Sequence, residues 1–572
     1  MAAPEIRRSC VGSPIGRRAL RLAVGLVLVL AASPTRAQPY SLGDRPPTPR
    51  EQAYLNKHMV EVRTVRPNAL SRARALSQTV PAGRPLETAA ASSSAVDNST
   101  LMYLPPIRSQ GSQGSCTCWA ACYYYNTFTQ ARDDEVDVSG GDNTRICSPA
   151  FLYPLINDGI DNGASTPYAM ARLDDIGSCS WALKPYDQND YTSWPTEAAW
   201  IEALGRRTST AHSISGSSQS GLDAIKQHVA NGNVAAVRFT VYDNFYDTYP
   251  SDTTGIHNRV YYAPSGAVAG GHAVTIVGYD DTRSYVDHRD GQTHYGAFLM
   301  ANSWGAGWGW YNSTETGSKG FFWVAYQMFL EGTFGNSAYF NDDRPQYEPV
   351  LYAVAGLNHD QRGRVTYGGG IGPTGSPEFT GPEPIAEDGG KAIAITDAKR
   401  VAVDLTDGAG LFEPGVPKQV FVTLAVDRRA SSDGTITSAD FVHDLDGDGL
   451  FETVPSPDPV VAVARRTTGY ATAELTPAYN IIEVVAIGPS ASNAEWVEIT
   501  WSGASADVVT IFWTADPPGG ARTWDTLDGP ALGDIVDNGD GTWTWTDKGT
   551  DPDMTGQAPG DVPLRCYILR AD

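Results

Sequence analysis

The stretch "QGSQGSCTCWA", Gln110 to Ala120, places two cysteines two positions apart, directly after a segment that contains two glycines. The residues that follow, "ACYYYNTFTQA", are long enough and apolar enough to continue as a helix. Cys116 then stands at the start of that helix, where the helix dipole and a neighbouring imidazolium make a thiol more acidic. Because the thiolate is the form that attacks a carbonyl carbon, the stretch predicts a nucleophilic cysteine.

A nucleophile of this kind needs three further groups. The attack generates an oxyanion, and the expected donors to it are the Cys116 backbone amide and the side-chain amide of Gln110. The expected base is His272, which follows two glycines and begins the apolar run "HAVTIVGY". In "FLMANSWGAGWGW" we expect Asn302 to orient the imidazole and Trp304 to cover the pair from water.

Three blocks of sequence now point to a family. "QGSQGSCTCWA", "GGHAVTIVGY" and "NSWGAGWGW" resemble, in order and in kind, the active-site blocks of the papain-like (C1) cysteine peptidases. The resemblance implies an α+β fold, in which a helical lobe and a β-barrel lobe meet at a cleft, and hydrolysis of peptide bonds without a cofactor. It implies that Gln110 is the oxyanion-hole glutamine, Cys116 the nucleophile, His272 the base and Asn302 the orienting residue. The separation of Cys116 from His272 is close to the roughly 130–150 residues typical of that family.

The choice between the two sulfur atoms rests on spacing. In the best-known members a tryptophan directly follows the catalytic cysteine, whereas here Trp119 follows Cys118. Choosing Cys118 restores that dipeptide but places Ser112, and no glutamine, six residues upstream. Because the glutamine spacing is tied to the oxyanion geometry, the sequence favours Cys116, with Cys118 as the alternative. Gln113 stands where many members have a cysteine that staples the active-site loop, so that bridge is expected to be missing.

The remaining features of the resemblance concern the substrate. It covers about residues 98–331, and within it "DNGASTPYAM" resembles the glycine-containing strand that binds the substrate backbone, with Gly163 as the candidate. The residue before the base is Gly271, a second candidate for substrate binding, which adds no charge to the cleft. A polypeptide substrate is therefore expected, but the preferred side chains are not predicted.

The other cysteines are assigned structural roles. Cys116, Cys118 and Cys122 lack the C-x₂-C spacing of zinc sites, and a helix turns the first two to different faces. We expect Cys118 and Cys122 to be packed thiols on one face of the helix. Cys147 and Cys179 flank two predicted helices and are candidates for a disulfide.

The N-terminal 97 residues divide into two segments. Residues 1–37 are typical of a signal peptide, with early arginines, the apolar run Leu22 to Ala32 and a small-residue cleavage site after Ala37. That run is shorter than the ~20 residues of a spanning helix, so we expect an exported protein, secreted, periplasmic or at the cell surface, without a membrane span after cleavage. Residues 38–97 are polar and are predicted to be a pro-segment or linker that masks the cleft, with one helix across Glu51 to Leu76.

The rest of the chain predicts three domains. Helical patterns followed by strand patterns in residues 98–342 agree with the two-lobed papain-like domain. Short strands between Gly, Asp and Pro turns predict two all-β sandwich domains, 343–489 and 490–572. The first resembles the P-domain-like jelly rolls of exported peptidases, and the second resembles Ig-like or fibronectin-like modules in its strand pattern. Both are expected to act as spacers, to stabilise the protein or to hold a surface or polymer.

One acidic loop is a candidate calcium site. "HDLDGDGLFET" offers Asp444, Asp446, Asp448 and Glu452 around a glycine, which resembles a calcium loop in a sandwich domain. The twelfth position, where such a loop has a bidentate glutamate, is Pro455. A structural Ca²⁺ and a plain acidic turn between two strands both remain open.

Charge and chemistry together set the expected function. With 42 basic and 65 acidic residues the net charge is −23, which excludes a nucleic-acid partner on electrostatic grounds. The sequence predicts an exported cysteine endopeptidase with a Cys-His-Asn site. Two alternatives stay open: acyl transfer to an amine by the same site, as in a transpeptidase, and an inactive papain-like scaffold that acts as a binding protein.

Overall fold

The computed structural model describes residues 40–68, 70, 94–246, 255–309, 320–386, 393–396, 399–413, 416–445, 449–458 and 460–477, and seven strands between 483 and 571. All of them belong to one unit, Tyr40–Asp572. The signal peptide predicted for residues 1–37 lies outside the described residues. Within the described residues, no helix combines the length and the apolar character needed to cross a bilayer.

The helical lobe is built around one buried helical segment. All its side chains from Cys116 to Thr129 are buried, and most of them are apolar or aromatic, which is typical of a helix at the centre of a core. As predicted, it extends through Cys116 to Asp133, but its middle part is a π-helix. The segments are α4 (Cys116–Cys118), η2 (Trp119–Asn126) and α5 (Thr127–Asp133), and the neighbouring helices are α6 (Pro149–Ile156), α7 (Thr166–Ile176) and α8 (Glu197–Leu204).

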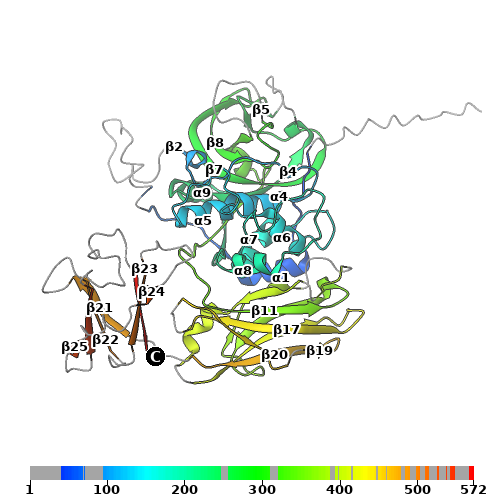
Figure 1. Ribbon diagram of the computed structural model, residues 1–572. Coiled ribbons are helices and arrows are strands. Elements are labelled where there is room, and N and C mark those ends of the chain that lie inside the picture. The colour runs from blue at the N-terminus through cyan, green and yellow to red at the C-terminus, as the bar shows by residue number, and fades with distance from the viewer. Residues whose placement is uncertain are drawn as a thin grey trace, which may run out of the picture. The chain divides into compact units, whose positions relative to one another are not determined.

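The second lobe is a ten-stranded sheet (Figure 1). The strand order is β1-β3-β10-β4-β7-β8-β9-β6-β5, and β2 also pairs with β7. Buried side chains of these strands share one core with the helical lobe, and in β7 and β8 the buried residues form continuous runs. The strands are β1 (Met59–Glu61), β2 (Ala95–Asp97), β3 (Ala211–Ser215), β4 (Ala235–Tyr242), β5 (Ile256–His257), β6 (Val260–Tyr261), β7 (Val268–Val286), β8 (Thr293–Ala301), β9 (Phe321–Ala325) and β10 (Ser337–Asn341). Short helices accompany them: α9 (Gln219–Ala230), α10 (Tyr326–Leu330), η1 (Asn98–Thr100) and η3 (Asp243–Tyr246).

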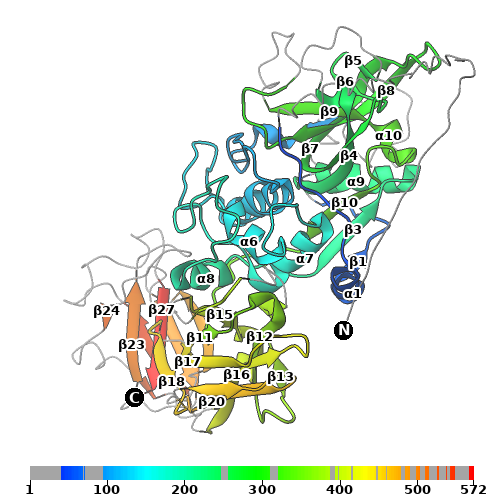
Figure 2. The ribbon, with the colours of Figure 1, turned by 90° about the vertical axis from the view of Figure 1, so that its right-hand side faces the viewer.

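The N-terminal segment differs from its prediction. The helix expected across Glu51 to Leu76 is interrupted after α1 (Pro49–His58), which begins with a capping box between Thr48 and Glu51, and residues 71–76 lie outside the described residues. The next residues form β1, which pairs in parallel with β3 at the edge of the sheet (Figure 2). The helix prediction was wrong because this pairing partner lies about 150 residues further along the chain, where local periodicity gives no sign of it.

The β region after the two lobes forms two antiparallel sheets whose inner faces share apolar side chains. One sheet has the order β15-β11-β17-β18 with β19 on β17, and the other has the order β13-β12-β16-β20 with β14 on β12. Their elements are β11 (Leu351–Asn358), η4 (Arg362–Arg364), β12 (Val365–Ile371), β13 (Phe379–Thr380), β14 (Ile385–Ala386), β15 (Val401–Asp404), η5 (Thr406–Leu411), β16 (Lys418–Val426), β17 (Gly434–His443), β18 (Glu452–Pro455), β19 (Val461–Val463) and β20 (Thr468–Leu475).

The second β region also consists of antiparallel strands, as predicted. Its two sheets have the orders β21-β22-β26-β25 and β24-β23-β27. The strands are β21 (Glu483–Pro489), β22 (Val497–Ser502), β23 (Val509–Thr514), β24 (Asp525–Thr526), β25 (Val536–Asp537), β26 (Thr542–Asp547) and β27 (Cys566–Ala571).

Buried polar contacts join the helical lobe to the first β region. Arg207 Nη1 donates to Asp404 Oδ2 at 2.6 Å, and both side chains are almost inaccessible to water. Arg172 Nη2 donates to the backbone oxygens of Glu383 and Pro384, each at 2.8 Å. Because a buried charge is costly unless it is paired, these contacts tie the β region to the helical lobe.

Candidate active site

Cys116 is the first residue of α4 and is fully buried. The backbone N–H groups of Ala273 and Thr117 act on its sulfur and lower the pKa of the thiol. Burial outweighs them and raises the pKa well above its ordinary value, and the nearby carboxylate of Asp44 adds to the rise. The sulfur therefore lies beside the residue that follows His272, and in this closed arrangement it is a neutral thiol.

His272 lies on β7 and is also fully buried. Its Nε2 and Asn302 Oδ1 are 2.8 Å apart, and its Nδ1 has no hydrogen-bond partner among the described residues. Burial lowers the pKa of His272 to about 4, although the hydrogen bond to Asn302 acts in the opposite direction. The imidazole is thus neutral here, with one nitrogen held and the other available for proton transfer.

Trp304 lies against the imidazole. The two rings are stacked with centroids 4.6 Å apart, and Phe239 meets the histidine ring edge-on at 5.7 Å. Aromatic rings on two sides exclude water from the His272–Asn302 hydrogen bond, which strengthens it.

Asn302 is held at the end of β8 by its backbone. Its N–H donates to Gly320 O at 2.9 Å, and its carbonyl accepts a hydrogen bond from the Tyr124 hydroxyl at 2.8 Å. The N–H of Ser303 donates to Asn302 Oδ1 at 2.8 Å. That oxygen therefore has two partners, which fixes the orientation of the amide. Sequence reasoning missed Tyr124 because it stands in a run of three tyrosines that reads as core.

Gln110 is buried near the same residues. Its Oε1 accepts a hydrogen bond from Ser303 Oγ at 2.6 Å, and its Nε2 donates to Gln113 O at 2.9 Å. Its backbone N–H donates to Ser303 O at 2.8 Å. Ser303 thus holds the side chains of both Gln110 and Asn302, a role that sequence reasoning did not assign.

The other cysteines of the helical lobe are buried free thiols. Burial raises the pKa of the Cys118 thiol well above its usual value. The neighbouring thiols of Cys122 and Cys116 raise it further. The disulfide suggested between Cys147 and Cys179 is not formed. Cys179 Sγ donates to Ser180 O, and Cys147 Sγ accepts from Asn126 Nδ2, so each sulfur has another partner.

Residues 40–45, here called the N-terminal strap, lie in the cleft between the lobes. Asp44 forms isolated β-bridges with Gly271 on one side and Ala164 on the other. The strap also covers Trp304, whose Nε1 donates to Ser41 O at 3.0 Å and whose ring stacks on Tyr40 at 4.9 Å. The two glycines singled out in the sequence, at 163 and 271, both face the strap backbone.

Gly163 has a conformation that explains the residue type. Its φ is +86°, and a Cβ at this position would lie 2.1 Å from Gly43 O. Only glycine allows the strap backbone to approach so closely. The structure therefore places Gly163 where an extended chain crosses the cleft.

The structure describes only two of the four residues of the predicted calcium loop. Asp444 Oδ2 accepts a hydrogen bond from Gly449 N at 3.1 Å, and Glu452 Oε2 lies 3.6 Å from His443 Nε2. The other two predicted ligands, Asp446 and Asp448, lie outside the described residues. Elsewhere in the described part, Asp287, Asp290 and His294 have ligand atoms within 4.8 Å of one another. Arg289 already binds Asp287 through Nη2 at 2.6 Å, which offsets the charge that a cation would need.

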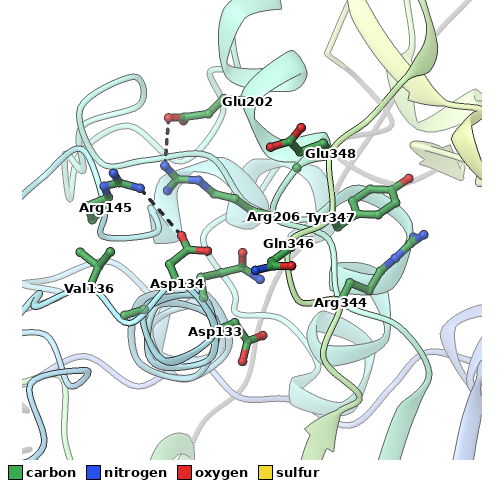
Figure 3. A pocket seen from close by; sticks show the side chains of 13 residues that line it. Asp133, Asp134, Val136, Arg145, Glu202, Arg206, Arg344, Gln346, Tyr347 and Glu348 are labelled. Carbon is green, nitrogen blue, oxygen red and sulfur yellow. Dashed lines mark hydrogen bonds and ion pairs between the residues drawn. The ribbon is translucent and has the colours of Figure 1, made fainter. Parts of the chain in front are cut away.

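A separate cavity of about 180 Å³ lies away from these residues (Figure 3). Its charged side chains pair with one another, Arg206 with Glu202 at 3.0 Å and Arg145 with Asp134 at 3.8 Å. The cavity contains none of the predicted catalytic residues. Its lining is Gln130, Ala131, Asp133, Asp134, Val136, Arg145, Glu202, Gly205, Arg206, Arg344, Gln346, Tyr347 and Glu348.

The two lobes match a known protein family. Residues 92–327 match the model of the papain family of cysteine proteases. These residues are a papain-family cysteine protease domain. In this protease domain the segments that carry Cys116, His272 and Asn302 all fall within the matched range, and the two β regions lie outside it.

Several plant cysteine proteases are among the solved structures that resemble this chain. The Carica candamarcensis cysteine protease CMS1MS2 is 16% identical, with 44% of this chain and 99% of that chain covered and a TM-score of 0.31. The bromelain protease of Ananas comosus is 15% identical, with 44% and 100% covered and a TM-score of 0.31. The proform of the ragweed pollen allergen Amb a 11 is 17% identical, with 51% and 77% covered and a TM-score of 0.31. The sequence has no match among curated proteins.

Proposed function

We propose that the protein is a cysteine endopeptidase whose nucleophile is Cys116. The observation that carries the proposal is the state of His272: Nε2 is held by Asn302 at 2.8 Å, while Nδ1 has no partner in the described part of the chain and the adjacent Ala273 N–H reaches the Cys116 thiol. This is the arrangement that general-base activation of a thiol requires. The Cys118 thiol lacks such a contact with the segment that carries the base.

The reaction proceeds through an acyl-enzyme. His272 Nδ1 takes the thiol proton as the Cys116 sulfur attacks the peptide carbonyl, and the new oxyanion accepts hydrogen bonds from the Cys116 N–H and the Gln110 amide. The C–N bond breaks as Nδ1 returns the proton to the leaving amine. Water, deprotonated by the same nitrogen, then attacks the thioester, and the acid product leaves with the thiol restored. The Asn302 side chain keeps the imidazole in the tautomer that this cycle needs.

The strap supports a masking role for the N-terminal segment. Tyr40 stacks on Trp304 and Asp44 bridges both sides of the cleft, so a substrate backbone could not enter while the strap is in place. The Asp44 carboxylate also raises the pKa of Cys116 and so disfavours the thiolate. In this proposal the enzyme is latent until the strap leaves, by proteolysis or by dissociation.

The proposed site of action is outside the cytoplasm, on the strength of the N-terminal signal pattern. N-terminal sequencing of the exported protein is expected to give Gln38 as the first residue. A mature chain that still begins at Met1 would contradict export by this signal.

Peptide hydrolysis tests the proposal directly. We expect hydrolysis by the protein with its strap displaced, loss of activity in Cys116→Ala and retention of most activity in Cys118→Ala. Loss only in Cys118→Ala would transfer the nucleophile to that residue. Products joined to an added amine, in place of hydrolysed products, would instead identify acyl transfer, and no reaction in any variant would favour a binding scaffold.

A further inference from the structure

The strap places one acidic side chain in the cleft at the position of a bound peptide residue. Asp44 donates its backbone N–H to Gly271 O at 3.0 Å, and the next residue, Arg45, donates to Ala164 O at 3.0 Å. These two acceptors belong to opposite sides of the cleft. A peptide substrate lying between the same backbone groups would present its own side chain where that of Asp44 now lies.

The carboxylate of Asp44 occupies a closed polar pocket. Its Oδ2 accepts from Arg238 Nε at 2.6 Å, and its Oδ1 accepts from Thr166 Oγ1 at 2.7 Å and from Thr166 N at 3.3 Å. The Asp44 side chain is 0% exposed. Both oxygens are therefore satisfied by donors that would suit any carboxylate of the same reach.

The pocket is built from both lobes and adjoins the catalytic residues. Thr166 is the first residue of α7, whereas Arg238 lies on β4 directly opposite Ala273 of β7. Burial raises the pKa of Asp44, and the neighbouring Arg238 and Thr166 work against that rise. The carboxylate is near enough to Cys116 to raise the pKa of its thiol. The pocket thus binds the residue of the bound chain that lies next to the reacting sulfur.

Gly271 gives the pocket its space. A Cβ at this position would lie 2.2 Å from Asp44 O and 3.2 Å from Asp44 Oδ2. Any side chain here would push the bound backbone and the carboxylate away. The glycine before the base, which the sequence offers as a candidate for substrate binding, leaves room for both the backbone and the carboxylate of Asp44.

Departure of the strap leaves Arg238 without the carboxylate of its ion pair. The Arg238 side chain is 34% exposed with the strap in place, and a partly buried cation is unfavourable without a counter-charge. The emptied pocket would therefore attract an anionic side chain and disfavour a basic one.

We propose that this pocket selects peptide substrates with an aspartate at the residue bound between Ala164 and Gly271, and that Arg238 and Thr166 are its specificity-determining residues. The inference rests on the proposed peptidase function. We expect aspartate to be preferred to glutamate. The single methylene of Asp44 already brings its carboxylate to all three donors, and the side chain is fully buried, so the extra methylene of glutamate would not fit.

The test uses the full chain with Asp44→Lys, which sets a lysine against Arg238 and displaces the strap. A peptide mixture is digested and the cleavage sites are read by mass spectrometry. We expect aspartate to be enriched at one fixed position near the cut, and an aspartate peptide to exceed its asparagine twin about a hundredfold in kcat/KM. In Arg238→Gln this ratio should fall to near one.

A matched control and a second readout complete the experiment. Arg465→Gln removes an exposed arginine of the first β region and should leave the ratio unchanged. Binding of the same labelled peptides to Asp44→Lys/Cys116→Ala is followed by fluorescence polarisation, which reports on the pocket even if no peptide bond is cleaved. Equal binding or cleavage of the aspartate and asparagine peptides would overturn the proposal, as would an equal loss for all peptides in Arg238→Gln. Selective binding without cleavage would retain the pocket and reject the peptidase.

Discussion

Ser303 donates a 2.6 Å hydrogen bond to Oε1 of Gln110, and its backbone N–H donates to the amide oxygen of Asn302 at 2.8 Å. One residue therefore fixes a donor of the proposed oxyanion hole and the residue that orients the base. The two parts of the proposed machinery, which come from chain segments about 190 residues apart, are positioned together.

This relationship predicts the effect of Ser303→Ala. Loss of one neutral hydrogen bond should lower kcat about tenfold with little change in KM, because Gln110 acts on the transition state. Ser303→Thr, which keeps the hydroxyl, should restore most of the rate. The measurement is steady-state kinetics in the strap-displaced protein, with Gln110→Ala as the reference background. An undiminished effect of Ser303→Ala in that background would refute action through Gln110.

The pKa of Cys116 predicts how labelling depends on the strap. Because burial and the Asp44 carboxylate both raise this pKa, iodoacetamide should label Cys116 slowly at neutral pH and faster only as the pH becomes alkaline. In Asp44→Lys the anion is lost and water enters, so labelling at pH 7 should rise at least about tenfold. Peptide mass spectrometry gives the rate at this cysteine alone. Glu61→Lys, an exposed change on β1, is the control and should behave as the unmodified protein does.

The buried ion pair between Arg207 and Asp404 predicts a strong effect on stability. Asp404→Ala leaves a buried guanidinium without its carboxylate and should lower the free energy of unfolding by about 3–5 kcal/mol. Glu378→Ala breaks a surface pair with Lys418 in the same β region and should cost less than about 1 kcal/mol. Denaturant unfolding of the two variants compares them. Similar midpoints for both would show that the contact between the protease lobes and the β region contributes little.

A buried histidine far from the cleft predicts sensitivity to acid. Burial lowers the pKa of His228 to about 4, although the Val234 carbonyl, 3.1 Å from Nε2, favours the protonated form. In the unfolded chain this histidine takes up a proton near pH 6.5, whereas in the folded protein it stays neutral until about pH 4. The free energy of unfolding is therefore unaffected above about pH 6.5 and falls as the pH decreases toward about 4. The expected loss between pH 7 and pH 5 is about 2 kcal/mol. His228→Gln should show a smaller drop in Tm over this range. An unchanged pH dependence would assign the acid sensitivity to other groups.

The residues of the candidate site could be proposed from the sequence because they stand out locally. Cys116 begins a helix, His272 follows two glycines at a strand, and Asn302 precedes a serine and a tryptophan. Arg238 and Asp44 escaped notice, since an arginine within a strand and an aspartate in "GDRPP" each read as ordinary surface residues. Their meaning depends on a contact between segments 194 residues apart, which only the folded chain reveals.

The same limit explains the errors in the N-terminal segment and among the cysteines. Residues 59–61 join the edge of a sheet through a partner far along the chain, so the predicted helix ends early. Cys147 and Cys179 are close in the fold, but each sulfur contacts a different partner. A disulfide requires a particular direction of both side chains, and the sequence pattern of the flanking helices does not predict that direction.

The anchoring of the segment behind the strap changes what a single cut can achieve. Beyond the strap, α1 contacts the protease lobe and β1 is hydrogen-bonded to β3. A protease that cuts between residues 71 and 93 would therefore leave the strap bound as a separate peptide. Activity would then appear by dissociation, rising on dilution and falling again when the released peptide is added back, so that the protein would carry its own reversible inhibitor.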